Sequence, residues 1–129
     1  LQNACVRQRR IFGEVPLPVV PLFENAKALA AAEKIATEAL KNGNFKSLIQ
    51  NVWAGRFEIM VGYSDSSKES GALASRLAIA EALLWLEKLV RKHHVTPVFF
   101  HGSGGSIDRG GGSIEEQIAW WPESALKAY

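Results

Sequence analysis

The sequence predicts an α/β fold in which short parallel strands alternate with helices. Three apolar runs, at residues 19–23, 57–61 and 95–100, have the composition of buried strands. Segments with helical periodicity separate these runs, and a connection from strand to helix to strand is right-handed and leaves the two strands parallel. Three such strands with their helices form either a sector of a β/α barrel or a small open sheet.

The first strand lies in a run over residues 16–23 that contains three prolines. Because proline donates no ladder hydrogen bond, this strand should take an end or an irregular position in the sheet. Asn25 can cap a following helix over Ala26–Lys41, in which apolar residues recur on one face. We expect the pair Asn42-Gly43 to end that helix.

Asn44 can cap a second, shorter helix that includes residues 47–49. The second strand, residues 57–61, has the sequence FEIMV and is closed by Gly62. Residues 63–68 follow as a polar turn, whose serines and aspartate favour tight turns. These elements complete the first unit of strand, helices and strand.

A long helix is expected from Gly71 to His94, because leucine, isoleucine and valine recur there at three- and four-residue spacing. Its last residues, 91–94, are two cations and two histidines, which complement the negative end of the helix dipole. We therefore interpret the histidines as a charge complement rather than as metal ligands. The third strand follows at 95–100, and Ser113 can cap another helix over Ile114–Ala119.

Size and composition agree with a single domain. The chain has 129 residues, of which 47% are hydrophobic, and this is enough for an apolar core. The formal net charge of +2 is too small to indicate nucleic acid or an anionic membrane as a partner. The single cysteine, Cys5, excludes an internal disulfide and fits a reducing compartment. Since no apolar run suits a membrane span or a signal peptide, we expect a cytoplasmic protein.

A glycine-dense segment follows the third strand. Six of the eleven glycines lie within residues 99–112, whose sequence is FFHGSGGSIDRGGG. Closely spaced glycines let backbone N–H groups approach an anion, and the guanidinium of Arg109 matches a phosphate or a carboxylate. A surface loop with incidental charges accounts equally well for this segment taken alone.

Each strand is followed by polar residues that can carry chemistry: Glu24 after the first, Asp65 and Lys68 after the second, and His101 and Arg109 after the third. Ligands of parallel α/β folds bind at the carboxyl ends of the strands, so these residues should converge. Two carboxylates from separate loops suit Mg²⁺ or Mn²⁺, and the nearby cations suit an anionic substrate. Taken singly, Glu24 could cap the next helix, Asp65 could stabilise a turn, and the cations could be solvated surface charges.

Three segments resemble, in order and spacing, signature segments of the bacterial- and plant-type phosphoenolpyruvate carboxylase family. They are VVPLFE at residues 19–24, VGYSDSSKESG at 61–71 and FHGSGGSIDRGGG at 100–112. Arg7-Gln8 also resembles an Arg-Gln active-site segment, although in the family a long helical stretch separates it from the PLFE motif. The resemblance divides the chain into an N-terminal segment, 1–15, with a remnant of the Arg-Gln region, and a sector of the catalytic barrel, 16–129.

The resemblance implies a largely helical, homotetrameric, allosteric enzyme built around a β/α (TIM-type) barrel. Such an enzyme carboxylates phosphoenolpyruvate with bicarbonate to oxaloacetate and phosphate, and it requires Mg²⁺ or Mn²⁺. By the same resemblance, Glu24 and Asp65 would hold the metal. The catalytic residues implied, which would lie in the bicarbonate region, are Arg109, His101 and Lys68. The substrate-binding residues implied are Arg7, Gly102, Ser103, Gly104 and Gly105.

The sequence departs from the family pattern at several positions. Ser103 stands where the family usually has an arginine that helps to hold the substrate phosphate, and Asp108 replaces a small residue beside Arg109. The Thr-Ala-His-Pro segment of the family is absent from these residues, and the first residue is leucine rather than methionine. We therefore expect part of a divergent member, inactive as an isolated chain. The alternative is a non-catalytic, metabolite-binding relative that senses phosphoenolpyruvate or aspartate.

Overall fold

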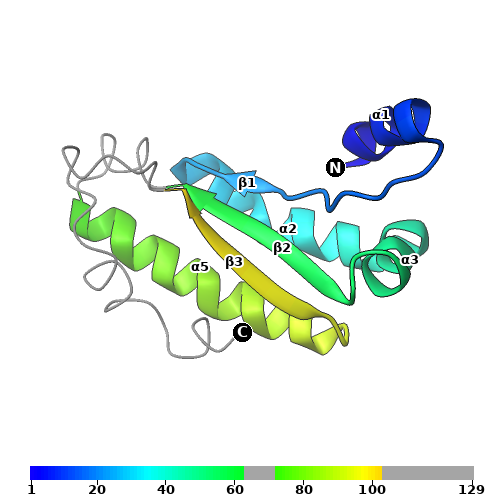
Figure 1. The fold of residues 1–129 in the computed structure, drawn as a ribbon. Coiled ribbons are helices and arrows are strands. Elements are labelled where there is room, and N and C mark those ends of the chain that lie inside the picture. Colours follow the sequence, from blue (N-terminus) through cyan, green and yellow to red (C-terminus); the bar gives the residue numbers. More distant parts are fainter. Residues whose placement is uncertain (63–71, 103–129) are drawn as a thin grey trace.

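The computed structural model describes residues 1–62 and 72–102, which form four helices and a three-stranded sheet (Figure 1). The helices are α1 (Gln2–Phe12), α2 (Ala26–Lys41), α3 (Gly43–Asn51) and α5 (Ala72–Lys92). The strands are β1 (Leu22–Phe23), β2 (Arg56–Gly62) and β3 (Thr96–Gly102). The expected helix at 114–119 lies outside the described residues. No helix within the two described ranges is long and apolar enough to cross a membrane.

The strands form a parallel sheet in the order β1-β2-β3, which confirms the predicted α/β class. Met60 of β2 aligns with Leu22 on one side and with Phe100 on the other. The Met60 N–H donates to the Pro21 carbonyl at 2.9 Å, so pairing begins just before β1. β1 is shorter than the predicted run over 19–23, because the prolines of this segment cannot donate to a ladder.

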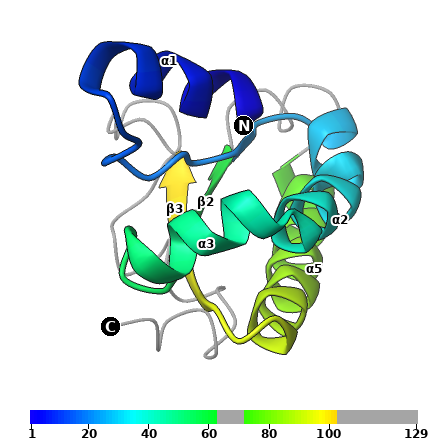
Figure 2. The same cartoon turned by 90° about the vertical axis from the view of Figure 1, so that its right-hand side faces the viewer.

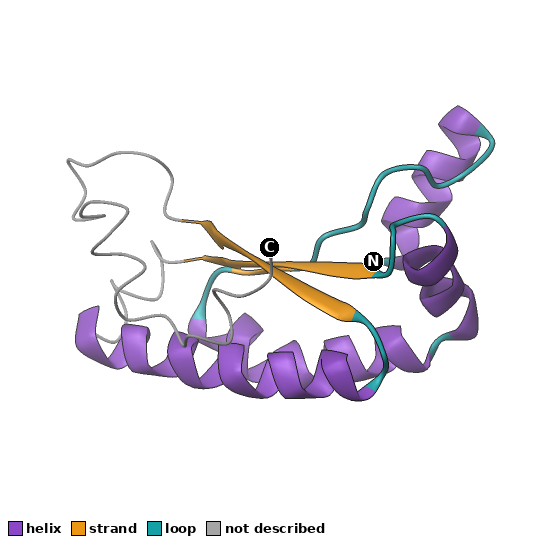
Figure 3. Ribbon diagram, turned by 60° about the horizontal axis from the view of Figure 1, so that its bottom comes forward, coloured by secondary structure: helices purple, strands orange, loops and turns teal. Residues whose placement is uncertain are grey.

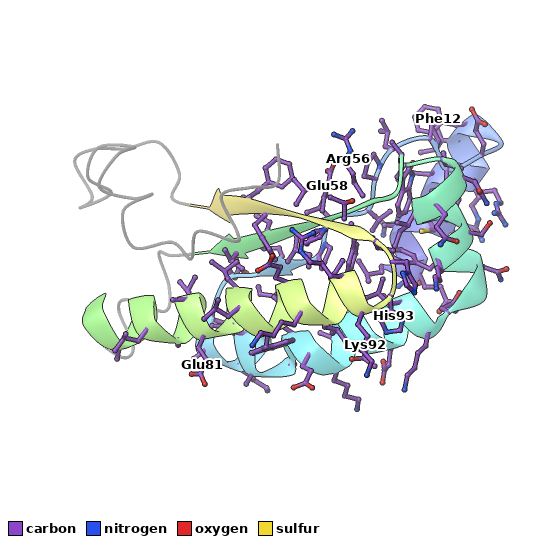
Figure 4. All side chains as sticks on the ribbon, turned by 90° about the horizontal axis from the view of Figure 1, so that it is seen from below. Phe12, Arg56, Glu58, Glu81, Lys92 and His93 are labelled. Atoms are coloured by element: carbon purple, nitrogen blue, oxygen red, sulfur yellow. The ribbon has the colours of Figure 1, made fainter. Side chains whose placement is uncertain are left out.

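One face of the sheet is covered by α2 and α5, which lie side by side beneath it (Figure 3). Three residues of β2 on this face, Phe57, Ile59 and Val61, are at most 1% exposed. The residues between them point the other way, and Arg56 and Glu58 lie on the side away from α5 (Figure 4). This alternation is typical of a strand with a single face in the core.

The junction between α2 and α3 differs from the prediction. α2 has the predicted bounds, and the Asn25 side chain caps its first turn. Gly43, however, has no left-handed conformation and is the first residue of α3. Asn42, rather than Asn44, caps α3, because its Oδ1 accepts a hydrogen bond from the Phe45 N–H at 3.0 Å. One asparagine therefore ends α2 and begins α3 without a loop between them.

The long helix α5 lies within the predicted limits of Gly71 and His94 and stops two residues short of the second. His93 and His94 form a turn, in which their N–H groups donate to the carbonyls of Val90 and Arg91 at 3.0 and 2.9 Å. His94 has a φ of 59°, and this left-handed backbone conformation directs the chain into β3.

No helix is predicted for residues 1–15. In the structure, Gln2–Phe12 form the helix α1. α1 ends at Gly13, whose φ of 77° is left-handed, and none of its residues is buried. Gln8 ties the helix to the segment that follows it. Its side-chain amide donates to the Leu17 carbonyl and accepts from the Leu17 N–H, both at 3.0 Å.

Trp53 fixes the same segment to the core. Its indole Nε1–H donates to the Val15 carbonyl at 3.1 Å, and its side chain is 4% exposed. Phe45 packs edge-on against the Trp53 ring and against Phe57, with ring centroids 5.4 and 5.9 Å apart. Buried aromatic pairs of this kind favour a fixed geometry. The chain between α1 and β1 is therefore held at a defined place on the domain.

We expect Trp53→Phe to lower the free energy of unfolding by about 1–3 kcal/mol, because it removes the donor of the Val15 carbonyl. Urea unfolding followed by circular dichroism measures the loss. Trp85→Phe is the matched control, since Trp85 is half-buried and its indole donates no hydrogen bond to a residue that the structure describes. Equal losses in the two variants would contradict this explanation.

His93 lies among cations at the end of α5, where Figure 4 shows it beside Lys92. Partial burial lowers the pKa of His93 below 6.5, and the positive charges of Lys46, Lys92, Lys41 and His94 lower it further. The carbonyls at a helix end would by themselves raise the pKa of a histidine. Burial and the cations outweigh them, so the fold favours neutral His93. This corrects its interpretation as a positively charged complement to the helix end.

Because its pKa is lowered by folding, His93 binds a proton more weakly in the folded chain than in the unfolded chain. Stability is therefore lost as the pH falls through 6.5, and it stays lower at more acidic pH. We expect His93→Gln to remove this part of the pH dependence between about pH 8 and about pH 5. Urea unfolding at the two pH values measures it.

A control for the cause is Lys46→Gln, which removes one of the charges that act on His93. The pKa of His93, followed by an NMR titration, should rise toward 6.5 in this variant. An unchanged titration would show that the cations do not set the charge of His93.

Candidate functional site at the carboxyl ends of the strands

The carboxyl ends of the three strands lie together at one edge of the sheet (Figure 1). Phe23, the last residue of β1, aligns with Val61, and Val61 aligns with His101 of β3. The next residue of β2, Gly62, aligns with Gly102. The predicted convergence is therefore confirmed for those strand ends that the structure describes.

Glu24 follows β1 directly, and its side chain is exposed. Gly62 lies against it: a Cβ atom placed on Gly62 would be 2.6 Å from the Glu24 Cα and 2.7 Å from its Cβ. Carbon atoms do not approach so closely, so a glycine is needed where these two backbones meet. This contact places Glu24 beside the point at which the chain leaves β2.

From the sequence, Gly62 is expected only to close a strand, and its contact with Glu24 is not predicted. The available signal is a glycine that closes an apolar strand, because such glycines often mark a close backbone approach. The structure also decides one alternative for Glu24. The N-cap of α2 is Asn25, which accepts from the Ala28 N–H at 2.8 Å, so Glu24 is not the capping residue.

Most of the other predicted site residues lie outside the described residues. These are Asp65, Lys68, Ser103, Gly104, Gly105 and Arg109. His101 and Gly102 are described as backbone of β3, at the same edge as Glu24. The fold therefore brings Glu24, the aligned glycines Gly62 and Gly102, and the backbone of His101 to the same edge.

Arg7 is placed elsewhere. It is an exposed residue of α1, and α1 lies toward the amino ends of β2 and β3 (Figure 1). The structure therefore does not bring Arg7 beside Glu24. The interpretation of Arg7-Gln8 as an active-site segment gains no support from this arrangement, since Gln8 is engaged with Leu17.

At this edge, the Glu24 carboxylate is a ligand of the kind that binds a hard divalent cation. Glu24 supplies carboxylate oxygens that are open to solvent, and Mg²⁺ and Mn²⁺ bind to proteins through a few such oxygens. Over residues 1–62 and 72–102, no group of three or more histidine, cysteine, aspartate or glutamate side chains gathers around a common point. A metal site here would therefore depend on Glu24 together with residues beyond these ranges.

The described fold is an α/β domain with a parallel sheet, and in enzymes with such sheets ligands bind at the carboxyl ends of adjacent strands. The sequence model of one family, described as phosphoenolpyruvate carboxylase, matches residues 1–129. The chain belongs to this family, and the predicted resemblance is confirmed.

Its relatives include phosphoenolpyruvate carboxylases of Actinobacillus pleuropneumoniae, Parasynechococcus marenigrum and Haemophilus influenzae. The chain is 38%, 37% and 39% identical to them over 112, 118 and 111 residues. These matches cover 87%, 89% and 86% of the chain, but 12% of each relative. The chain therefore spans about 12% of the length of the relatives that it matches.

We expect Gly62→Ala to lower the free energy of unfolding by about 1–3 kcal/mol, because the added methyl group overlaps the Glu24 backbone. Gly43→Ala is the matched control. A Cβ atom there meets nothing within 4 Å, and the residue lies in a helix, so this variant should be neutral or slightly more stable. Thermal unfolding of both variants measures the difference, and a harmless Gly62→Ala would mean that the two strand ends separate easily.

Proposed function

We propose that the chain forms the metal- and bicarbonate-binding part of the active site of a phosphoenolpyruvate carboxylase. The reaction joins bicarbonate to phosphoenolpyruvate and yields oxaloacetate and phosphate. Family membership and the names of the relatives support this proposal. The observation that carries it is the row of strand ends at which Glu24, Gly62 and His101 come together.

We also propose that the sheet is a sector of a β/α barrel. The strands follow one another in the order β1-β2-β3, and right-handed crossovers in that order put α2 and α5 on one face, as Figure 3 shows. A doubly wound sheet would instead have helices on both faces. The opposite face carries the row Leu22, Met60 and Phe100, of which Leu22 is 47% and Phe100 40% exposed. In a closed barrel, such a row would fill the interior.

In this proposal Glu24 and Asp65 would hold Mg²⁺ or Mn²⁺, and Gly62 keeps the Glu24 backbone in place. When bound, the metal would stabilise the negative charge that develops on the enolate oxygen as phosphate is released. Lys68, His101 and Arg109 would hold bicarbonate. The positive charges of Lys68 and Arg109 would offset the repulsion between two anionic reactants and keep them in contact.

The glycine segment would bind the substrate phosphate through backbone N–H groups of Gly102, Gly104 and Gly105. Ser103 supplies a hydroxyl at the position where the family usually has a guanidinium. It would therefore bind phosphate without an ion pair and more weakly, since hydrogen bonds to charged donors are the stronger ones. The longer protein would assemble as a homotetramer, as the family resemblance implies.

A second function is favoured by one observation, the serine at position 103. A relative with a weakened phosphate site could bind phosphoenolpyruvate or aspartate without turnover and act as a sensor. The two functions differ in their product, because only the enzyme releases phosphate when bicarbonate is present.

We expect the full-length protein to release phosphate from phosphoenolpyruvate in a reaction that requires both bicarbonate and Mg²⁺. Glu24→Gln and Asp65→Asn should each lower kcat/KM at least about a hundredfold, because each removes a metal-binding carboxylate. Glu33→Gln is the control, since Glu33 is an exposed carboxylate on α2. The isolated 129-residue chain should show little or no turnover.

Binding of phosphoenolpyruvate without phosphate release would support the sensor instead. Full activity in Glu24→Gln would show that the row of strand ends is not the metal site, even if the protein is a carboxylase.

A further inference from the structure

Helices α1, α2 and α3, whose arrangement Figure 2 shows, line a cavity of about 620 Å³. α1, which lines the cavity, lies toward the amino ends of β2 and β3, whereas Glu24 follows the carboxyl end of β1 (Figure 1). The size of the cavity is within the range of about 300–1,000 Å³ that is typical of small-molecule sites. None of the interactions proposed for the carboxylase reaction uses this cavity. Arg7, a substrate-binding residue by the family resemblance, does not line it.

The walls of the cavity are mainly apolar. Ile35 and Ala39 line it from α2, and Phe45 and Leu48 line it from α3. Val6 of α1 faces the same space and is still 45% exposed, although the other walls belong to the core or pack against it. Val6 is therefore an apolar side chain of α1 that the described residues leave partly uncovered, whereas Ala4 and Cys5 of the same helix pack against the core.

The rim of the cavity is positively charged. Arg9 and Arg10, in the last turn of α1, line it, and neither forms an ion pair with another residue of the described ranges. Glu38 of α2 also lines the cavity and contributes one negative charge against these two positive charges. An arginine side chain is a strong donor to carboxylate, sulfonate or phosphate oxygens.

We propose that this cavity binds a small amphipathic anion, with an apolar body against Phe45 and Leu48 and an acidic group at Arg9 and Arg10. The positive rim favours an anion over a neutral or cationic ligand, and the apolar walls favour a ligand with an apolar body. The site does not depend on the proposed carboxylase function. Binding also has a structural effect, because it covers Val6 on α1, a helix that has no buried residue.

The probe is 8-anilinonaphthalene-1-sulfonate, an aromatic sulfonate whose fluorescence increases in an apolar site. Its neutral analogue N-phenyl-1-naphthylamine lacks the acidic group. We expect one sulfonate to bind per chain. The double variant Arg9→Gln/Arg10→Gln should weaken the sulfonate roughly five- to thirtyfold and leave the neutral dye unchanged.

The matched control is Lys27→Gln/Lys34→Gln, which removes two exposed charges of α2 that do not line the cavity. It should leave both affinities unchanged. Two further variants fill the cavity and should abolish both dyes: Leu48→Trp, and Gln2→Trp at the exposed rim, in case the first does not fold. Hydrogen exchange of the α1 amides should slow when the sulfonate is bound.

Equal weakening by the arginine and the lysine variants would overturn the proposal, since only net charge would then matter. Binding that survives both cavity-filling variants would overturn it as well, because the dye would then occupy other apolar surface. A chain dimer whose formation competes with the dye would assign the cavity to a second copy of the chain instead.

Discussion

Strand β2 is hydrogen-bonded on both sides, and the rest of the described fold depends on that pairing. Its register with β1 and β3 decides which side chains share a row and which face receives α2 and α5. Phe57, Ile59 and Val61 are buried beneath it because their parity in the strand points them to those helices. A shift by one residue would turn these three side chains out of the core and would move Gly62 away from Glu24.

Local sequence patterns predict the elements that a short-range interaction decides. The bounds of α2 follow from its periodicity and from the Asn25 cap. The cap of α3 was predicted wrongly, because Asn42 and Asn44 are both suitable residues and only the contact with the Phe45 N–H selects Asn42. α1 was not predicted, and it is attached both by Leu1, Ala4 and Cys5, which pack against the core, and by Gln8, which reaches across to Leu17 outside the helix. The contact of Gln8 with Leu17 lies beyond the helix and cannot be predicted from the pattern within it.

The candidate site also has features that the sequence pattern predicts and features that depend on contacts between elements. Glu24 and His101 could be placed at one edge from the order of strands, because parallel strands have their carboxyl ends together. The contact of Gly62 with Glu24 could not, since it depends on the register between β1 and β2. The roles of Asp65, Lys68 and Arg109 rest on the family resemblance and stay predictions. Arg7 lies on α1, toward the amino ends of β2 and β3, and its role also stays a prediction.

Pro97 has a consequence for how this sheet can grow. The Thr96 N–H donates to the Gly55 carbonyl at 2.9 Å, toward β2, and successive residues of a strand alternate in direction. Pro97 therefore turns away from β2, toward the side of β3 on which the described residues place no strand, and there it has a carbonyl but no N–H. A strand that adds at this edge must leave one of its own acceptors unmatched at that position. The neighbour that fits best on this side is therefore a strand that bulges or ends where the donor is missing.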